Sequence, residues 1–149
     1  EIYWAELTAL AYAAGYTVQF PWHDPDERLR AERIMNMAGD GVLLPRTNLN
    51  GLKEHLLNAA GVVGVDSGLA HITAALNVPA VTLYGPTSAG LTGATGVAQK
   101  NLQVNYECAP CMKKLCRKPL PSRLEPPCFE TVPPALVWQV LAKQMEKSA

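Results

Sequence analysis

Two apolar stretches separated by a helical segment constrain the fold of this chain more than any other feature. Residues 61–66 (GVVGVD) and 79–85 (PAVTLYG) are apolar on both faces of a strand, and residues 67–77 (SGLAHITAALN) between them have a helical pattern. Strands that are buried on both faces occur in parallel sheets, because crossover helices cover both sides. The sequence therefore predicts an open, doubly wound α/β domain with a parallel, Rossmann-like sheet.

The rest of the chain continues this alternation of helices and strands. Asp24 followed by Pro25 is a typical helix start, since an aspartate caps the first turn and a proline fits the first helical position. Gly15 is a typical helix end, and Asn48 is a second candidate cap. From these signals and the apolar spacing we expect helices over 2–14, 26–37, 49–60 and 135–147, strands over 16–20 and 42–44, and a loop over 85–96.

The length and the cysteine distribution define the expected domain organisation. A chain of 149 residues fits one compact domain. All four cysteines and seven of the twelve prolines fall in residues 106–134, which we call the Cys/Pro segment. We therefore expect an α/β core over 1–105, then the Cys/Pro segment, and then a C-terminal helix over 135–149. The apolar residues of that helix expected to pack on the domain are Leu136, Val140, Leu141 and Met145.

Charge and hydropathy exclude several classes of function. The chain has 13 basic and 13 acidic side chains, so no overall field attracts nucleic acid. Apolar runs are broken by glycine and proline well before the roughly 20 residues that a membrane-spanning helix needs. The first residues lack an initiator methionine, a basic leader and a cleavage site, so we expect the chain to start inside a larger protein.

The segment from Asp66 to His71 is the strongest candidate site. It lies where a buried strand meets a helix, and the first backbone N–H groups of a helix are unpaired and carry partial positive charge. Such a terminus favours a phosphate, Gly68 permits close approach, and His71 can donate a hydrogen bond to a phosphate oxygen. The alternative is that Asp66 or Ser67 only caps the helix and that His71 is a partly buried structural histidine.

A second candidate follows the next strand. Gly85, Pro86 and Thr87 are small residues at the end of a parallel strand, where a backbone can come close to a diphosphate or a sugar. The alternative is an ordinary turn. The chain has neither a Gly-x-Gly-x-x-Gly sequence after a first strand nor a Gly-Lys-Ser/Thr loop, so the usual NAD and P-loop interpretations lack support.

The third candidate is the cysteine set of the Cys/Pro segment. Cys108, Cys111, Cys116 and Cys128 have the spacing C-x2-C-x4-C-x11-C, and four thiolates can bind one tetrahedral zinc ion. Two disulfides, or four thiols that are merely close in sequence, are the alternatives. The same segment carries a group of basic residues that can contact a phosphorylated acceptor or lipid headgroups, or can simply be solvated. These residues are Lys113, Lys114, Arg117, Lys118 and Arg123.

Taken together, VGVDSGLAHITAALNVPAVTLYGPTSAGLTG, the following CAPC and PPC, and the upstream PWHDPDERLRAERI resemble the bacterial heptosyltransferases of glycosyltransferase family 9. The pattern is closer to the type I enzymes, and it covers essentially the whole chain. The resemblance implies the C-terminal half of a GT-B glycosyltransferase that builds the inner core of lipopolysaccharide by inverting transfer. It also implies ADP-heptose as the donor and no cofactor for the transfer.

The resemblance also assigns roles to individual residues. It implies that Asp66, Ser67, Gly68, Leu69 and His71 bind the donor diphosphate, with His71 stabilising the leaving group, and that Glu27 holds the adenosine ribose. The catalytic carboxylate and the site for a Kdo-lipid A type acceptor belong to an N-terminal domain that this chain lacks, so we expect the chain alone to be inactive. A family member for another sugar, or a non-catalytic nucleotide- or phosphate-binding module, are the alternatives.

Family membership further implies a cytoplasmic protein at the inner face of the inner membrane of a Gram-negative bacterium. Disulfides are disfavoured in that compartment. For the four cysteines, a structural zinc ion is therefore preferred over two disulfides.

Overall fold

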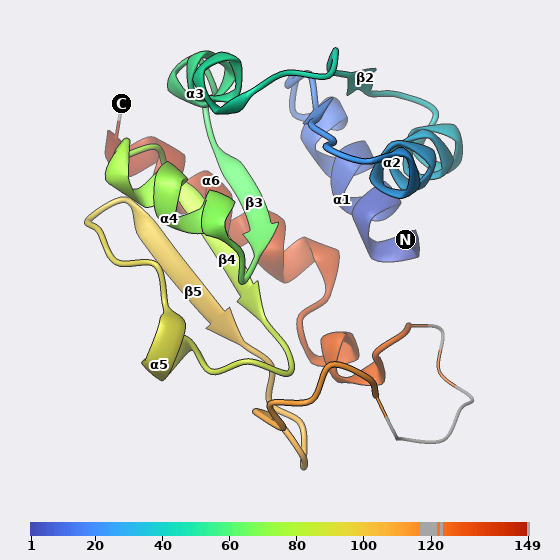
Figure 1. The fold of residues 1–149 in the computed structure, drawn as a ribbon, viewed down its shortest axis with the longest axis vertical. Coiled ribbons are helices and arrows are strands. Elements are labelled where there is room, and N and C mark those ends of the chain that lie inside the picture. The colour runs from blue at the N-terminus through green and yellow to red at the C-terminus, as the bar shows by residue number, and fades with distance from the viewer. Residues whose placement is uncertain (117–121, 123, 149) are drawn as a thin grey trace. The chain divides into compact units, whose positions relative to one another are not determined.

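The computed structural model describes residues 1–116, 122 and 124–148. The chain divides into two compact units, Glu1–His55 (unit 1) and Leu56–Ala149 (unit 2). Figure 1 shows their helices and strands. Each unit is built from parallel strands and helices, so the predicted α/β class is confirmed.

Unit 1 places two helices beside a short parallel sheet. Strand β1 (Gln19–Phe20) pairs with β2 (Val42–Leu43) in parallel. Helices α1 (Ile2–Ala13) and α2 (Pro25–Ala38) pack on each other, and their buried residues include Ala5, Leu7, Ala31 and Ile34. The strands are shorter than predicted, because only two residues of each make ladder pairs.

The helix boundaries of unit 1 follow the signals in the sequence. Gly15 and Gly39 have φ of 87° and 76° after α1 and α2, a conformation that favours glycine. Asp24 Oδ1 accepts a hydrogen bond from Glu27 N at 2.9 Å, which confirms the predicted cap. Asn48 Oδ1 likewise accepts from Gly51 N at 3.1 Å before α3 (Leu49–Leu57), which ends earlier than predicted.

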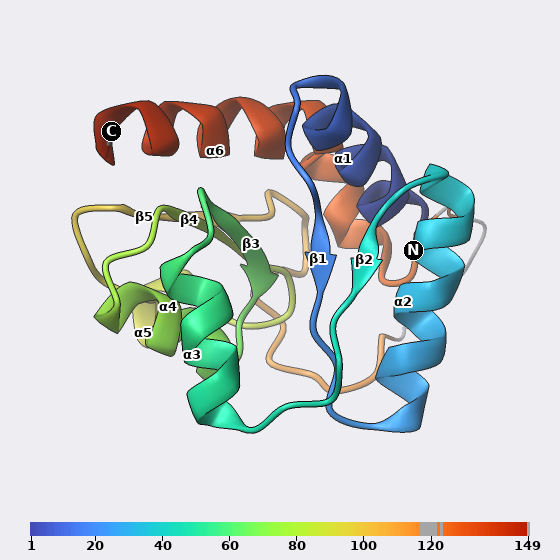
Figure 2. The same ribbon diagram turned by 90° about the horizontal axis from the view of Figure 1, so that it is seen from above.

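Unit 2 contains a three-stranded parallel sheet in the order β3-β4-β5. The strands are β3 (Val62–Val65), β4 (Ala80–Tyr84) and β5 (Gln99–Gln103). Helix α4 (Gly68–Ala75) covers one face, and α6 (Pro134–Ser148) covers the other, as Figure 2 shows. Every residue of the central strand β4 is buried, and Val81 and Tyr84 have no exposed surface.

Three features of unit 2 differ from the sequence-based expectations. Strand β5 was not predicted, because QKNLQ lacks apolar alternation. The predicted loop over 85–96 contains a single helical turn, α5 (Ala89–Thr92), and the Cys/Pro segment contains a 3-10 helix, η1 (Pro127–Thr131). On α6, Leu141 is buried as predicted, but Leu136 is exposed, because the buried stripe runs through Val137 instead.

Candidate functional site

The junction of β3 and α4 presents an uncapped helix N-terminus. Ser67 is the N-cap residue, with extended backbone (φ −158°, ψ 166°), and its side chain makes no capping hydrogen bond. Helix α4 begins at Gly68. The backbone N–H groups of its first turn therefore have no helical carbonyl oxygen four residues earlier to which they could donate. Ala70 N of this turn donates to Ser67 O at 3.1 Å, whereas the Ser67 side chain caps neither Gly68 N nor Leu69 N and leaves these two donors for another acceptor.

Asp66 is held by a neighbouring segment rather than by the helix that follows it. Its Oδ2 atom accepts a hydrogen bond from Thr92 Oγ1 at 2.9 Å. The Tyr84 hydroxyl donates to Thr92 O at 3.3 Å and accepts from Ala94 N at 3.1 Å. Burial raises the pKa of the Tyr84 hydroxyl, and the Asp66 carboxylate adds to the rise. The ends of β3 and β4 and the turn α5 thus share one hydrogen-bond network.

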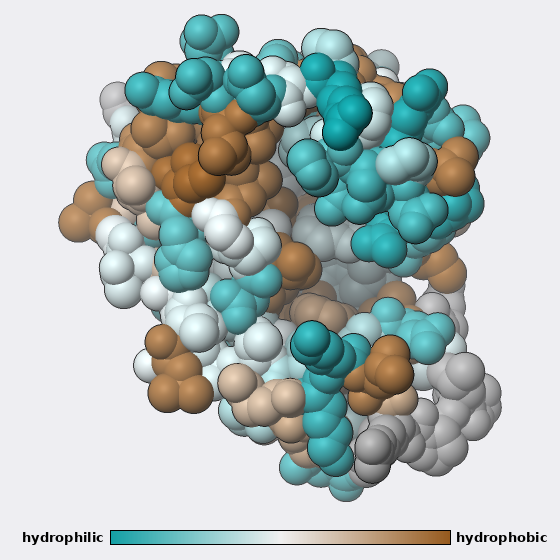
Figure 3. Space-filling model, viewed as in Figure 1, coloured by the Kyte–Doolittle hydropathy of each residue, from teal (hydrophilic) through white to brown (hydrophobic). Residues whose placement is uncertain are grey.

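Gly68 and His71 face open space at the start of α4. A Cβ atom built on Gly68 meets no heavy atom within 4 Å. His71 is exposed one turn into the helix, and Leu69 between them is half-buried. On the face shown in Figure 3, apolar side chains gather over α4. The five predicted donor-site residues between Asp66 and His71 thus lie at one helix terminus, and their contact with a ligand stays a prediction.

The second candidate segment, Gly85 to Thr87, packs against the Cys/Pro segment. Gly85 is buried, and a Cβ atom there would lie 2.6 Å from Phe129 Cζ. Pro86 O accepts a hydrogen bond from Met112 N of the Cys/Pro segment at 2.7 Å. Glycine is therefore required at position 85 by packing. A donor-binding role for Gly85, Pro86 and Thr87 stays a prediction.

Gln103, at the end of β5, holds the same segment and was missed by the sequence reasoning. Its Nε2 donates to Tyr84 O at 2.9 Å, Thr87 O at 3.2 Å and Gly85 O at 3.4 Å, while its Oε1 accepts from Ala89 N at 2.9 Å. The alternation of amide side chains at 99, 101 and 103 was a signal for a strand, since a period of two is the strand period.

Glu27 belongs to unit 1, where it helps to close the start of α2. Its Oε2 atom accepts a hydrogen bond from His23 N at 2.7 Å, while its own N–H donates to Asp24. These two hydrogen bonds resemble a capping box, except that Glu27 accepts from His23 N instead of from the N-cap residue Asp24. The Glu27 side chain is exposed, and the ribose contact predicted for it is not tested by this geometry.

The four cysteines are free thiols. Cys108 and Cys116 are exposed, whereas Cys128 lies in an apolar cluster with Val104 and Val132. Burial raises the pKa of the Cys128 thiol, and the negative charges of the other three thiolates add to the rise.

The effect of the other three thiolates on the pKa of Cys128 does not show that the four sulfur atoms could bind one zinc ion. Charges interact over longer distances than the Zn–S bond of about 2.3 Å. Within the described ranges, no group of three or more His, Cys, Asp or Glu side chains is placed to hold a metal ion. The metal clip stays a prediction. Lys113 and Lys114 are exposed, and Arg117, Lys118 and Arg123 lie outside the described residues.

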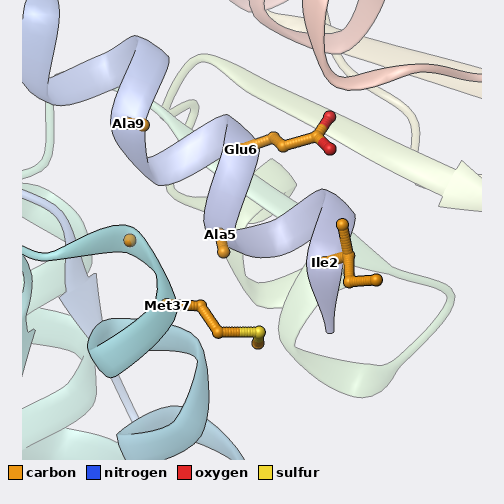
Figure 4. Close-up of a pocket in the computed structure, with 6 residues that line it drawn as sticks. Ile2, Ala5, Glu6, Ala9 and Met37 are labelled. Atoms are coloured by element: carbon orange, nitrogen blue, oxygen red, sulfur yellow. The ribbon is translucent and has the colours of Figure 1, made fainter.

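A hollow in unit 1 is lined by none of the predicted site residues. It has a volume of about 240 Å³ and lies between α1 and α2, as Figure 4 shows. A hollow of about 40 Å³ in unit 2 is lined in part by Ser67, Leu69 and Thr73. Both are smaller than the roughly 300–1,000 Å³ of a typical ligand pocket. The lining residues of the larger hollow are Ile2, Ala5, Glu6, Ala9, Met37 and Ala38.

None of the helices in the described part of the chain combines the length and the apolar character needed to span a membrane.

Comparison with known proteins identifies relatives of this chain. The family model described as glycosyltransferase family 9 (heptosyltransferase) matches residues 1–120. Lipopolysaccharide heptosyltransferase 1 of Pseudomonas aeruginosa is 39% identical over 155 residues, which cover 98% of this chain and 42% of that protein. Lipopolysaccharide heptosyltransferase 1 of Escherichia coli K12 is 41% identical over 99 residues, 66% of this chain and 31% of that protein.

Two solved structures have the same fold. The E. coli heptosyltransferase WaaC with ADP superposes with a TM-score of 0.76 at 29% identity, over 96% of this chain and 38% of that one. The E. coli ADP-heptose lps heptosyltransferase II gives a TM-score of 0.74 at 21% identity, over 98% of this chain and 41% of that one. The chain thus spans about two fifths of the length of the relatives that match nearly all of it.

Proposed function

The chain belongs to glycosyltransferase family 9, the heptosyltransferases, and on that premise we propose that it forms the donor-binding half of an inverting heptosyltransferase. The donor is ADP-heptose, and its diphosphate binds at the start of α4. The observation that carries this proposal is the uncapped N-terminus at Ser67, with open space above Gly68. A relative of the same fold was solved with ADP, which supports the nucleotide.

The chemistry of this half is stabilisation of the leaving group. When the glycosidic bond breaks, negative charge grows on the ADP diphosphate. The N–H groups of the first turn of α4 and the His71 imidazole can donate to those oxygens, and fixed donors of this kind lower the barrier. In this proposal the transfer needs no metal cofactor, because the helix terminus and His71 supply the compensating charge.

The acceptor and its deprotonation belong to the part of the enzyme outside this chain. Inverting transfer needs a general base for the acceptor hydroxyl. We propose that a Kdo-lipid A type acceptor is bound by a preceding domain, with the enzyme at the cytoplasmic face of the inner membrane. The proposal that the enzyme contacts anionic headgroups is supported by four exposed residues of the Cys/Pro segment, because they combine apolar and basic side chains. They are Met112, Lys113, Lys114 and Leu115.

Calorimetric titration of the chain with ADP tests the donor site. We expect His71→Ala to weaken ADP binding by about 1–3 kcal/mol, because a charge-assisted hydrogen bond to the diphosphate is lost. Asp66→Ala should weaken binding by a similar amount, since it also releases Thr92. His55→Ala on α3 is the matched control and should leave the affinity unchanged. Unchanged affinity in both site variants would refute the assignment.

A further inference from the structure

Gln103 is the side chain that joins the turn after β4 to the rest of unit 2. The turn, which we define as residues 84–89, leaves the sheet at the carboxyl end of β4, next to the Asp66 network. The Gln103 amide uses both of its ends on this turn: its two N–H hydrogens are shared among three carbonyl oxygens, and its oxygen accepts from one N–H. An amide that spans four backbone groups restrains all of them at once.

The same turn is held from two other directions. Met112 N donates to Pro86 O, and the Phe129 ring occupies the space that a side chain at Gly85 would need. At the far end of α5, Thr92 Oγ1 donates to Asp66. Gln103 accepts from Ala89 N at the start of α5. Helix α5 therefore connects Gln103 to Asp66, because its first residue, Ala89, bonds to Gln103 and its last residue, Thr92, bonds to Asp66.

We propose that Gln103 is a positioning residue for the donor site, because it fixes the turn of residues 84–89 and, through α5, the Asp66 carboxylate. This inference rests on the proposed function, since it needs the donor to bind at the carboxyl ends of β3 and β4. Gln103 itself touches no ligand in the proposal. Its role is to hold the backbone of Gly85 and Thr87 and the network of Asp66 in one arrangement before the nucleotide binds.

Strand β5 provides a matched control for this role. Gln99 lies on the same face of the strand, and its Nε2 donates to Val78 O at 2.7 Å at the amino end of β5. Its Oε1 is buried without a hydrogen-bond partner among the described residues. Gln99 is therefore a glutamine of the same strand whose side chain also bonds to the main chain, but at the end of the strand opposite to the proposed donor site.

The first test compares Gln103→Met with Gln99→Met in calorimetric titrations with ADP. Gln103→Met keeps the length of the side chain and removes all four hydrogen bonds. We expect ADP affinity to fall about fivefold or more in Gln103→Met, and to change less than about twofold in Gln99→Met. Hydrogen exchange should show a faster-exchanging Ala89 amide in Gln103→Met only, because this N–H loses its acceptor.

The second test is a pH profile of Gln103→Glu, which also serves if Gln103→Met does not fold. At about pH 8 the introduced carboxylate cannot donate to the three carbonyl oxygens, so ADP binding should be about fivefold weaker than in the wild-type chain. At about pH 5 the carbonyl oxygens favour the protonated carboxyl, which can donate one hydrogen bond and accept another. Affinity relative to wild type should then recover in part, whereas Gln99→Glu should show no such profile.

The outcomes separate the two proposals. If the wild-type chain does not bind ADP, the proposed function and this inference both fail. If the wild-type chain binds, His71→Ala weakens binding, and the Gln103 variants bind as wild type does at both pH values, the inference alone is overturned. A loss of affinity in Gln103→Glu that does not recover at low pH would also overturn it, provided that circular dichroism shows a folded chain.

Discussion

At the scale of single residues, two glycines with similar sequence settings have opposite roles. Gly68 and Gly85 each follow a parallel strand, and the sequence predicts close approach of a ligand at both. In the structure, a Cβ atom at Gly68 would meet open space, whereas one at Gly85 would clash with the Phe129 ring. The difference could not be predicted, because Phe129 lies 44 positions further along the chain in a segment with no regular pattern.

Alanine at each glycine should separate binding from stability. Gly85→Ala should lower the free energy of unfolding by about 1–3 kcal/mol, because the Phe129 ring must shift. Gly68→Ala should change it by less than about 0.5 kcal/mol, since nothing obstructs the methyl group, but it should weaken ADP binding where the diphosphate approaches the backbone. Urea unfolding and calorimetry measure both. Full ADP affinity in Gly68→Ala would contradict close approach at this position.

At the scale of elements, the sequence predicts those that carry local signals. The caps at Asp24 and Asn48 and the helix end at Gly15 are present as expected, because short-range chemistry determines them. Strand β5 escapes prediction because four of its five side chains are amides or lysine, and its pairing with β4 is a long-range contact. The candidate site was found only in part for the same reason: Gln103 lies on the strand that was missed.

The cysteines of the Cys/Pro segment should differ in reactivity. Cys108 and Cys116 are exposed and should react first with a thiol reagent, whereas Cys128 is buried. Because burial raises the pKa of the Cys128 thiol, this group stays protonated to higher pH, and its reaction should need a pH above the roughly 8.5 of a free cysteine. Rates followed by mass spectrometry against pH give the order.

A bound metal would produce a different result in the same experiment. All four thiols would be protected together, a chelator would release them together, and elemental analysis would find about one zinc per chain. That result would establish the metal clip predicted from the spacing and contradict the graded order. Less than about 0.2 zinc per chain with four titratable thiols would leave the free thiols as the correct description.

At the scale of the whole molecule, the chain spans 42% of its Pseudomonas aeruginosa relative. Its two units are both of the α/β type, and the predicted ribose contact at Glu27 belongs to one while the predicted diphosphate site belongs to the other. The segment from Asp66 to His71 was predicted from its place between a strand and a helix, whereas the role of Glu27 is implied only by the family resemblance. The assignment of the general base to another domain is implied by the family resemblance and stays a proposal.

The chain by itself should bind the donor without transferring the sugar. We expect saturable binding of ADP-heptose in calorimetry and no heptose on a Kdo-lipid A acceptor after incubation, because we propose that the base and the acceptor site lie in another domain. A longer protein that includes the preceding domain is the positive control. Transfer by the 149-residue chain alone would show that the catalytic group lies within it.

The Gln103 side chain binds only main-chain atoms of the turn that it holds. Such bonds do not depend on which side chains the turn carries, apart from the glycine that the Phe129 ring requires. Residues 87–91 can therefore diverge during evolution while their backbone keeps its path. A directed-evolution library at these positions should change which nucleotide sugar is accepted more readily than it unfolds the protein.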